Sequence, residues 1–277
     1  MKDRAGWVFK GLACLLLIFA LVLTYLSLAE LLMPETGKTV KISGKMVVDC
    51  SHMDEDYIMV RANKSKKKLK VRISCDVNKE KIVLNYNLNG NGDFEVFPLQ
   101  FGNRKYAVTL YQNIGGKKYS QEGQVGVKPN MADERRCFLY PNQYVNYDAN
   151  TACVREAMKM CEGMTEQTRI YQTICDYVKG HFVYDFIKSV TVQPGTLPDI
   201  DGCWEKNMGI CQDLSAMMIA MLRSQGIPAR LTIGTLGSGT YHAWVTAYVN
   251  GEEQFYDPTV EVNAGSRNET YTTERFY

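Results

Sequence analysis

Three side chains in the C-terminal half of the chain have the types and the order needed for thiol-based acyl transfer: Cys211, His242 and Asp257. Cys211 begins a stretch whose apolar residues recur at helical spacing, on one face: Leu214, Met217, Met218, Met221 and Leu222. Gly-Ile-Pro at 226–228 predicts the end of this helix. A thiol in the first turn lies near the positive helix end and free backbone N–H groups, which favour the nucleophilic thiolate. The competing interpretation is a buried cysteine acting as a small apolar side chain.

His242 and Asp257 fall on a predicted hairpin. Asn250-Gly251 is a strong two-residue turn signal, and it follows the alternating segment YHAWVTAYV at 241–249. With this turn, Trp244 lies opposite Asp257, and alternation places His242 on the same face as Trp244. Asp257 is then the diagonal neighbour of His242 across the hairpin. A carboxylate that accepts from one imidazole nitrogen fixes the tautomer and leaves the other nitrogen for the thiol.

The segments GICQDLSAMMIAMLRSQGIPARLTIGTL, HAWVTAYV and YDPT resemble the core of the transglutaminase-like superfamily, which is distantly similar to papain-like thiol enzymes. The resemblance covers residues 209–260 closely and extends more loosely upstream through YVKGHFVYD. It implies that Cys211 is the nucleophile, His242 the general base and acid, and Asp257 the orienting carboxylate. It also implies an α+β catalytic domain, preceded by a small antiparallel β-sandwich in many exported members. The backbone N–H of Cys211 is a candidate oxyanion donor on geometry.

The region before this core has a residue pattern typical of β-strands. Residues 38–128 contain six short β-like segments separated by turn signals, which predicts an Ig-like β-sandwich: DYIMVRA, KLKVRISC, KIVLNYNL, DFEVFPL, RKYAVTLYQ and KKYSQEGQVGV. Residues 130–277 then form the predicted catalytic domain. It opens with helices at 152–164 and 165–179. The tail after Val262 either closes over the site or is frayed.

The N-terminal residues 1–36 contain a run without charge at 11–29, close to the roughly 20 residues that span a bilayer. Basic residues precede this run and acidic residues follow it, which predicts a cytoplasmic N-terminus and an extracytoplasmic catalytic domain. Two interpretations remain open. The run is either an uncleaved signal anchor, which its length favours, or a signal peptide cut after Ala29.

Composition and residue spacing limit the possible partners and metal or disulfide sites. The 277 residues are 45% apolar and 22% charged with a net charge of +2, which gives no support to a nucleic-acid partner. The nine cysteines follow no scaffold or zinc spacing, and a Cys50–Cys75 bridge within the first domain is left open by the sequence. The basic run at 64–70 is a solvated turn or strand edge, with contact to an anionic cell-envelope component as the sharper alternative.

The predicted chemistry needs no cofactor. Cys211 attacks a peptide or carboxamide carbonyl, and an acyl-enzyme forms. Water as acceptor gives a peptidase or amidase acting on extracytoplasmic protein or peptide, which ranks first; a lysine amine gives a cross-linking transglutaminase. A membrane-tethered binding module without catalysis is an alternative from a different class. A metal site made of Cys203, Cys211 and His242 is a third, although its spacing matches no finger pattern.

Overall fold

The computed structural model describes residues 37–265 and 269–277. Within these ranges, no helix is both long and apolar enough to cross a membrane. The predicted anchor or signal peptide at residues 1–36 lies outside the described residues, so it stays a prediction.

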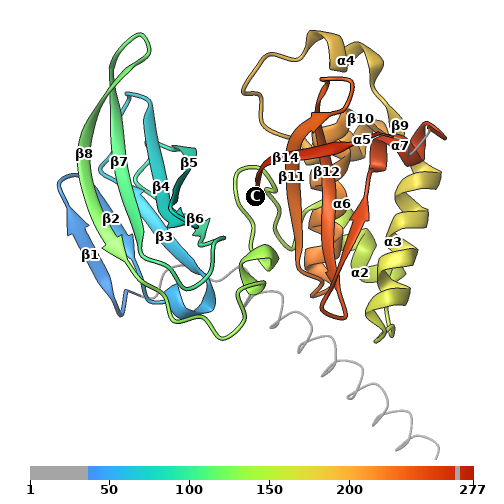
Figure 1. Cartoon of the computed structure of the whole chain (residues 1–277), viewed down its shortest axis with the longest axis horizontal. Helices are drawn as coiled ribbons and strands as arrows, with labels where there is room; N and C mark the ends of the chain where they lie inside the picture. The colour runs from blue at the N-terminus through green and yellow to red at the C-terminus, as the bar shows by residue number, and fades with distance from the viewer. Residues whose placement is uncertain (1–36, 266–268) are drawn as a thin grey trace, which may run out of the picture. The chain divides into compact units, whose positions relative to one another are not determined.

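Residues 40–127 fold into two four-stranded antiparallel sheets, with strand orders β1-β2-β3-β6 and β5-β4-β7-β8 (Figure 1). Their strands are β1 Val40–Ser43, β2 Met46–Asp49, β3 Tyr57–Ala62, β4 Leu69–Val77, β5 Glu80–Leu88, β6 Glu95–Pro98, β7 Tyr106–Gly115 and β8 Lys118–Val127, with a short 3-10 turn η1 at Met53–Glu55. The six predicted segments correspond to β3 to β8. The hairpin β1–β2 is an addition, and its turn residue Gly44 approaches β8 so closely that a Cβ would lie 1.8 Å from the Glu122 carbonyl oxygen.

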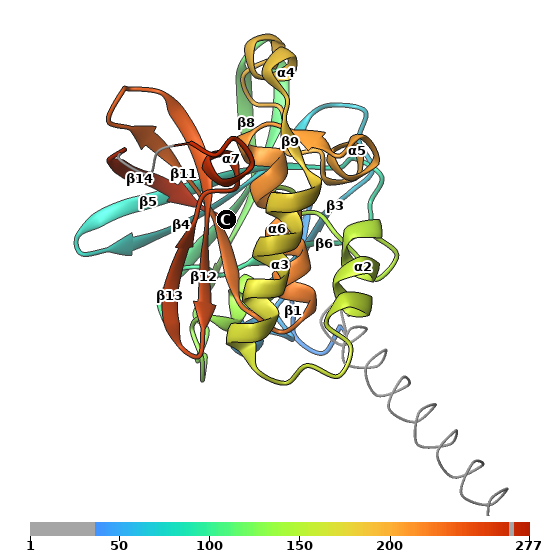
Figure 2. The same cartoon turned by 90° about the vertical axis from the view of Figure 1, so that its right-hand side faces the viewer.

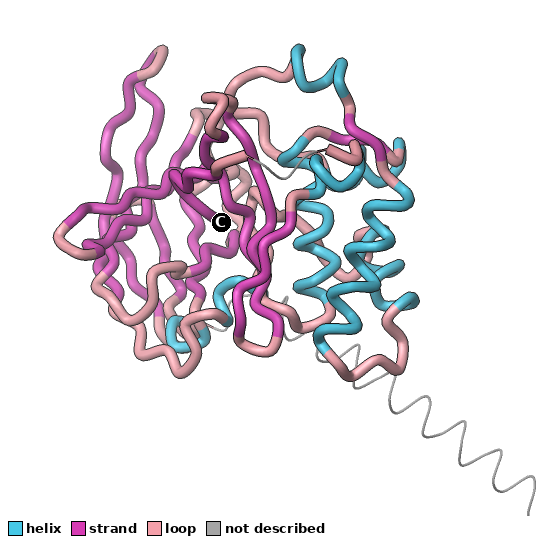
Figure 3. Tube along the Cα trace, turned by 45° about the vertical axis from the view of Figure 1, so that its right-hand side comes forward, coloured by secondary structure: helices cyan, strands magenta, loops and turns pink. Residues whose placement is uncertain are grey.

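The remaining elements combine helices with a third antiparallel sheet of order β13-β12-β11-β14 (Figures 1 and 2). They are η2 Arg136–Leu139, α2 Ala152–Met160, α3 Gln167–His181, β9 Val183–Tyr184, α4 Phe186–Thr191, α5 Ile200–Lys206, β10 Met208–Gly209, α6 Cys211–Ser224, β11 Ala229–Leu236, β12 Tyr241–Val249, β13 Glu252–Tyr256, α7 Pro258–Val262 and β14 Tyr271–Phe276. Figure 3 shows the helices gathered on one side of this sheet. The fold is α+β, as predicted.

The α6 helix is buried on all sides and not only on its predicted apolar face. It contacts α2, α3, β11 and β12, and every residue from Asp213 to Ser224 is buried. Its polar residues are satisfied inside the protein. Fully buried Arg223 donates to the backbone oxygens of Ala229 (2.8 Å), Tyr140 (2.6 Å) and Tyr277 (3.1 Å). A helix that looks amphipathic in sequence is therefore the centre of the core.

Two further expectations are resolved by the structure. Cys50 and Cys75 are both buried free thiols, so the bridge between them is absent. Residues 269–277 of the C-terminal tail are not frayed, because β14 pairs antiparallel with β11 along one edge of the third sheet. Tyr277 then exchanges two backbone hydrogen bonds with Leu231.

Candidate active site

Cys211 is the first residue of α6, as the sequence predicted. Ile210 at the N-cap has extended backbone angles, and Gly209 lies in β10, which pairs in parallel with β9. A Cβ at Gly209 would lie 2.7 Å from Cys203 Sγ and 2.9 Å from Asp213 Cβ, so only glycine allows this close approach. Cys211 is partly exposed, whereas the seven other cysteines in the described part of the chain are buried. The chain thus presents one accessible sulfur at a helix N-terminus.

A buried carboxylate, Asp213, organises the turn that carries Cys211. Its Oδ2 accepts from the Ile210 backbone N–H (3.1 Å), and its Oδ1 accepts from the Asp199 N–H (3.0 Å). Lys188 of α4 forms an ion pair with the same carboxylate, with its Nζ 2.7 Å from Asp213 Oδ2. Asp213 therefore connects the start of α6 to α4 and to the loop before α5.

The β12–β13 hairpin has the predicted register. Val249 pairs with Glu252 and Val245 with Tyr256. The next positions in the same register are Trp244 and Asp257. Both faces of β12 are buried, although strict alternation would leave one face to solvent. The face that bears His242 also carries three other buried side chains: Trp244, Thr246 and Tyr248. Part of this cover comes from β14, where the Tyr271 ring lies edge-on to Trp244 at 5.1 Å.

His242 and Asp257 form a direct hydrogen bond, with Nε2 2.8 Å from Oδ2. Asp257 is held in place because it is also the N-cap of α7, where its Oδ1 accepts from the N–H groups of Thr259 (2.9 Å) and Val260 (3.3 Å). The Tyr271 hydroxyl donates to the same Oδ2 at 2.7 Å. With Nε2 engaged, the other imidazole nitrogen is left for the sulfur.

The electrostatics favour a charged imidazole. Burial opposes the charge, but hydrogen bonds to Asp257 and to Cys211 outweigh it and raise the pKa of His242 to about 9. Burial likewise opposes the charge on Asp257, yet the hydrogen bonds from His242 and Tyr271 lower the pKa of its carboxyl group. Both shifts support the same ion pair, a protonated His242 beside an ionised Asp257.

The structure thus brings all three sequence-predicted residues together and adds three that sequence analysis missed: Lys188, Asp213 and Tyr271. The signal for Asp213 was available, since an acidic residue at the third position of a helix often accepts from the N-cap N–H. Nothing local in the sequence links Tyr271 to Asp257 or Lys188 to Asp213, because each contact depends on tertiary packing.

Exposed apolar side chains border this region. Val183 lies in β9, and Phe186, Ile187 and Val190 follow on α4, where they are 68%, 78% and 84% exposed. Asp185, the N-cap of α4, follows Tyr184. Burial raises the pKa of the Tyr184 hydroxyl, and the charge on the nearby Cys211 sulfur raises it further. An apolar surface therefore continues outward from the neighbourhood of the sulfur.

Among residues 37–265 and 269–277, no group of three His, Cys, Asp or Glu side chains is arranged to hold a metal ion. Cys203, the proposed third ligand beside Cys211 and His242, is buried with its Sγ against Gly209.

Comparison with known proteins identifies one family. Residues 155–258 match the family model of the transglutaminase-like superfamily, a range that includes Cys211, His242 and Asp257. No curated protein sequence matches the chain.

Solved structures show distant similarity. A candidate cysteine protease from Cytophaga hutchinsonii is 13% identical, with 86% of this chain and 90% of that chain covered and a TM-score of 0.40. The periplasmic domain of TgpA from Pseudomonas aeruginosa, bound to ethylmercury, is 15% identical, with 82% and 76% covered and a TM-score of 0.37. Red sea bream transglutaminase is 15% identical, with 73% and 48% covered and a TM-score of 0.28.

Proposed function

Because the chain carries a transglutaminase-like domain at residues 155–258, we propose that it is a thiol-dependent acyl-transfer enzyme that acts on protein or peptide amides. Hydrolysis is the reaction we propose first. The proposal rests on one observation, the 2.8 Å hydrogen bond between His242 and Asp257 beside the partly exposed Cys211 at the start of α6.

Acylation follows from these groups. The Cys211 thiolate attacks the amide carbonyl carbon, a C–S bond forms, and the tetrahedral oxyanion collapses with cleavage of the C–N bond. His242, with its pKa raised to about 9, is protonated at neutral pH and can donate its proton to the departing amine. Asp257 keeps the imidazole ring oriented and stabilises its charge.

The first turn of α6 supplies the electrostatic support. The initial backbone N–H groups of a helix have no intrahelical acceptor, so the N–H of Cys211 is available to the oxyanion. Asp213 fixes this turn through the Ile210 N–H, which keeps the donor and the sulfur in one geometry.

Deacylation regenerates the thiolate and the protonated His242. His242, now neutral, removes a proton from water, and the resulting hydroxide equivalent attacks the thioester carbonyl, breaks the C–S bond and releases a carboxylic acid. A lysine amine in place of water would give an isopeptide bond. The exposed apolar side chains on α4 offer a surface for an extended polypeptide, which supports a macromolecular amide as the substrate.

The test incubates the full-length chain with casein and a biotinylated primary amine, beside a Cys211→Ser variant as a matched control. We expect casein fragments with the wild-type chain and none with the variant. Amine incorporation without fragments would replace hydrolysis by cross-linking as the reaction. If neither product forms while Cys211 stays unmodified, the enzyme proposal fails and the non-catalytic binding module takes its place.

We also propose that the reaction takes place outside the cytoplasm, with the chain attached to the membrane through residues 11–29. This rests on the apolar run and on its flanking charges. Alkaline extraction of membranes tests it: the chain should stay in the pellet and be digested by protease added to intact spheroplasts. Full release into the supernatant would contradict the anchor and favour cleavage after Ala29.

A further inference from the structure

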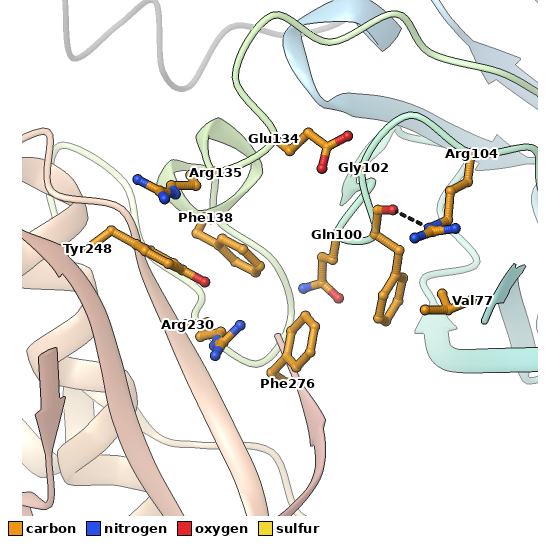
Figure 4. Close-up of a pocket in the computed structure, with 11 residues that line it drawn as sticks. Val77, Gln100, Gly102, Arg104, Glu134, Arg135, Phe138, Arg230, Tyr248 and Phe276 are labelled. Atoms are coloured by element: carbon orange, nitrogen blue, oxygen red, sulfur yellow. Dashed lines mark hydrogen bonds between the residues drawn. The ribbon is translucent and has the colours of Figure 1, made fainter. Parts of the chain in front are cut away.

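A cleft of about 300 Å³ lies away from the Cys211 sulfur, between the N-terminal sheets and the C-terminal sheet (Figure 4). Gln100 and Arg104 line it from the segment after β6, and Arg135 and Phe138 line it from the region of η2. Phe276 of β14 closes it from the C-terminal sheet. We call it the arginine cleft. Its volume is at the lower end of the range of small-ligand sites.

Gln100 is the unusual residue of the arginine cleft. It is only 5% exposed, yet neither its amide nitrogen nor its amide oxygen has a hydrogen-bond partner among the described residues. Figure 4 shows the amide pointing into the space between Phe138 and Phe276. A buried amide without a partner lowers the stability of the protein, so a ligand that offers both a donor and an acceptor would bind favourably to Gln100. A peptide group has that pair of functions.

Three arginines and Glu134 line the cleft around this amide. Arg104 donates from Nε to the Phe101 carbonyl oxygen (2.9 Å) and from Nη1 to the Asp76 carbonyl oxygen (3.4 Å). Arg135 lies on the other side of Phe138 (Figure 4), with its guanidinium 5.2 Å from the Tyr248 ring centroid. Arg230 stacks over Phe276 at 4.8 Å while pairing with Glu253 at 3.2 Å. Neither Arg104 nor Arg135 has a carboxylate within ion-pair distance in the described part of the chain. Guanidinium groups bind carboxylates in a bidentate manner, which points to an anionic carboxylate as ligand.

Aromatic rings supply the third feature. Phe101, Phe138 and Phe276 line the same cleft, with Phe101 and Phe276 at 5.3 Å and Phe138 and Phe276 at 5.8 Å between centroids. One peptide group, one carboxylate and one apolar side chain occur together at the last residue of a polypeptide. We propose that the arginine cleft binds a peptide C-terminus that ends in an apolar residue, with its last peptide group on Gln100 and its carboxylate on Arg104, which lies on the same side of the cleft as Gln100 (Figure 4).

This site is separate from Cys211. Tyr248, which lines the cleft, is six residues from His242 along β12, or about 20 Å of extended strand. The proposal therefore does not depend on the enzyme proposal. It describes a second docking point through which a protein partner with a free C-terminus, including a protein substrate, can be held.

The test measures binding of acetyl-Ala-Ala-Phe with a free carboxylate, and of the same peptide with a C-terminal carboxamide, by titration calorimetry. The protein is the full-length chain with Cys211→Ser, which prevents turnover. We expect the free acid to bind at least tenfold more tightly than the carboxamide. Arg104→Gln should abolish that difference, because it removes the charge that faces the carboxylate without emptying the cleft. Glu134→Gln is the matched control. It also changes a charge on the cleft wall, but should leave binding of the acid unchanged or make it tighter.

The Gln100→Met variant is a second test, and its expected result cannot be produced by a loss of folding. It should remove binding of the acid while raising the melting temperature of the unliganded chain, because a buried unpaired amide is replaced by an apolar group. The proposal is overturned if acid and carboxamide bind equally, if neither binds at millimolar concentration, or if Gln100→Met binds the acid as well as the parent.

Discussion

Two buried carboxylates flank the region of Cys211, and they differ in the cation that each one holds. Asp257 contacts His242, whose pKa is raised to about 9, and Asp213 contacts the ammonium group of Lys188. Asp257 is the N-cap of α7 and ends the β12–β13 hairpin, whereas Asp213 lies inside the first turn of α6. The first pair can take part in proton transfer, and the second can only hold geometry.

This difference explains how one site combines a changing charge with a fixed backbone. The proton on His242 must leave and return during turnover, so its environment changes within each cycle. The Lys188–Asp213 pair keeps the helix start fixed, because two backbone N–H groups and one ammonium group converge on one carboxylate. Variants of each pair test whether proton transfer and positioning are separate roles of the two carboxylates.

Asp257→Asn should have the largest effect. The amide keeps the shape but cannot stabilise the imidazolium, and the loss in kcat should be about 10³–10⁴-fold, as in other oriented histidine sites. Steady-state peptide hydrolysis with the melting temperature measured in parallel checks this. A loss of less than about tenfold would remove Asp257 from the proton-transfer pair.

Lys188→Met should act mainly on stability. The substitution leaves the buried Asp213 charge without its cation, and the free energy of unfolding should fall by roughly 3 kcal/mol. Urea titration measures this. The double variant Lys188→Met with Asp213→Asn should recover part of the loss, since it removes the uncompensated charge. If the loss in the double variant equals the sum of the losses in Lys188→Met and in Asp213→Asn alone, the two side chains do not interact.

The pH dependence of stability distinguishes the two pairs. The folded-state pKa of His242 is raised from 6.5 to about 9, so its contribution is fully present below pH 6.5 and is lost as pH rises through about 9. The shift corresponds to a stabilisation of about 3 kcal/mol at most. Urea titrations of wild type and His242→Gln should therefore converge between pH 6.5 and pH 9. Parallel curves over this range would mean that His242 is not charged in the folded protein.

Tyr271→Phe should give the smallest effect. It removes the hydroxyl that donates to Asp257 Oδ2 at 2.7 Å while keeping the ring that packs on Trp244. Loss of one hydrogen bond to a charged group corresponds to roughly tenfold in kcat. The pH profile of kcat/KM should also shift, because Asp257 loses one of the hydrogen bonds that stabilise its charge. An unchanged profile and rate would reduce Tyr271 to a packing residue.

The hairpin and the helix start could be predicted because their signals are local. Asn250-Gly251 fixes the pairing of β12 and β13, and the Gly-Ile-Pro sequence at 226–228 follows the last turn of α6. The contribution of β14 could not be predicted in the same way. It reaches β11 only after the chain has passed through α7, so no local pattern gives its register.

The burial of α6 was underestimated for a related reason. Asp213, Ser215 and Arg223 look like a solvent-facing side in sequence, yet all three are fully buried. Their partners are backbone groups and a lysine from elements distant in sequence, as for Ser215, whose hydroxyl donates to the Ala243 oxygen at 3.3 Å. A polar residue can be buried wherever tertiary structure satisfies it, and the sequence alone does not identify those partners.

The most direct measurement is the rate at which iodoacetamide alkylates Cys211 as a function of pH, followed by peptide mapping in the full-length chain. In the wild type, alkylation of Cys211 should stay rapid well below pH 8, because a charged His242 stabilises the thiolate. In His242→Ala the rate should fall to that of an unactivated thiol at each pH tested. Identical pH profiles for the two proteins would contradict the assignment of Cys211 and His242 as a catalytic pair.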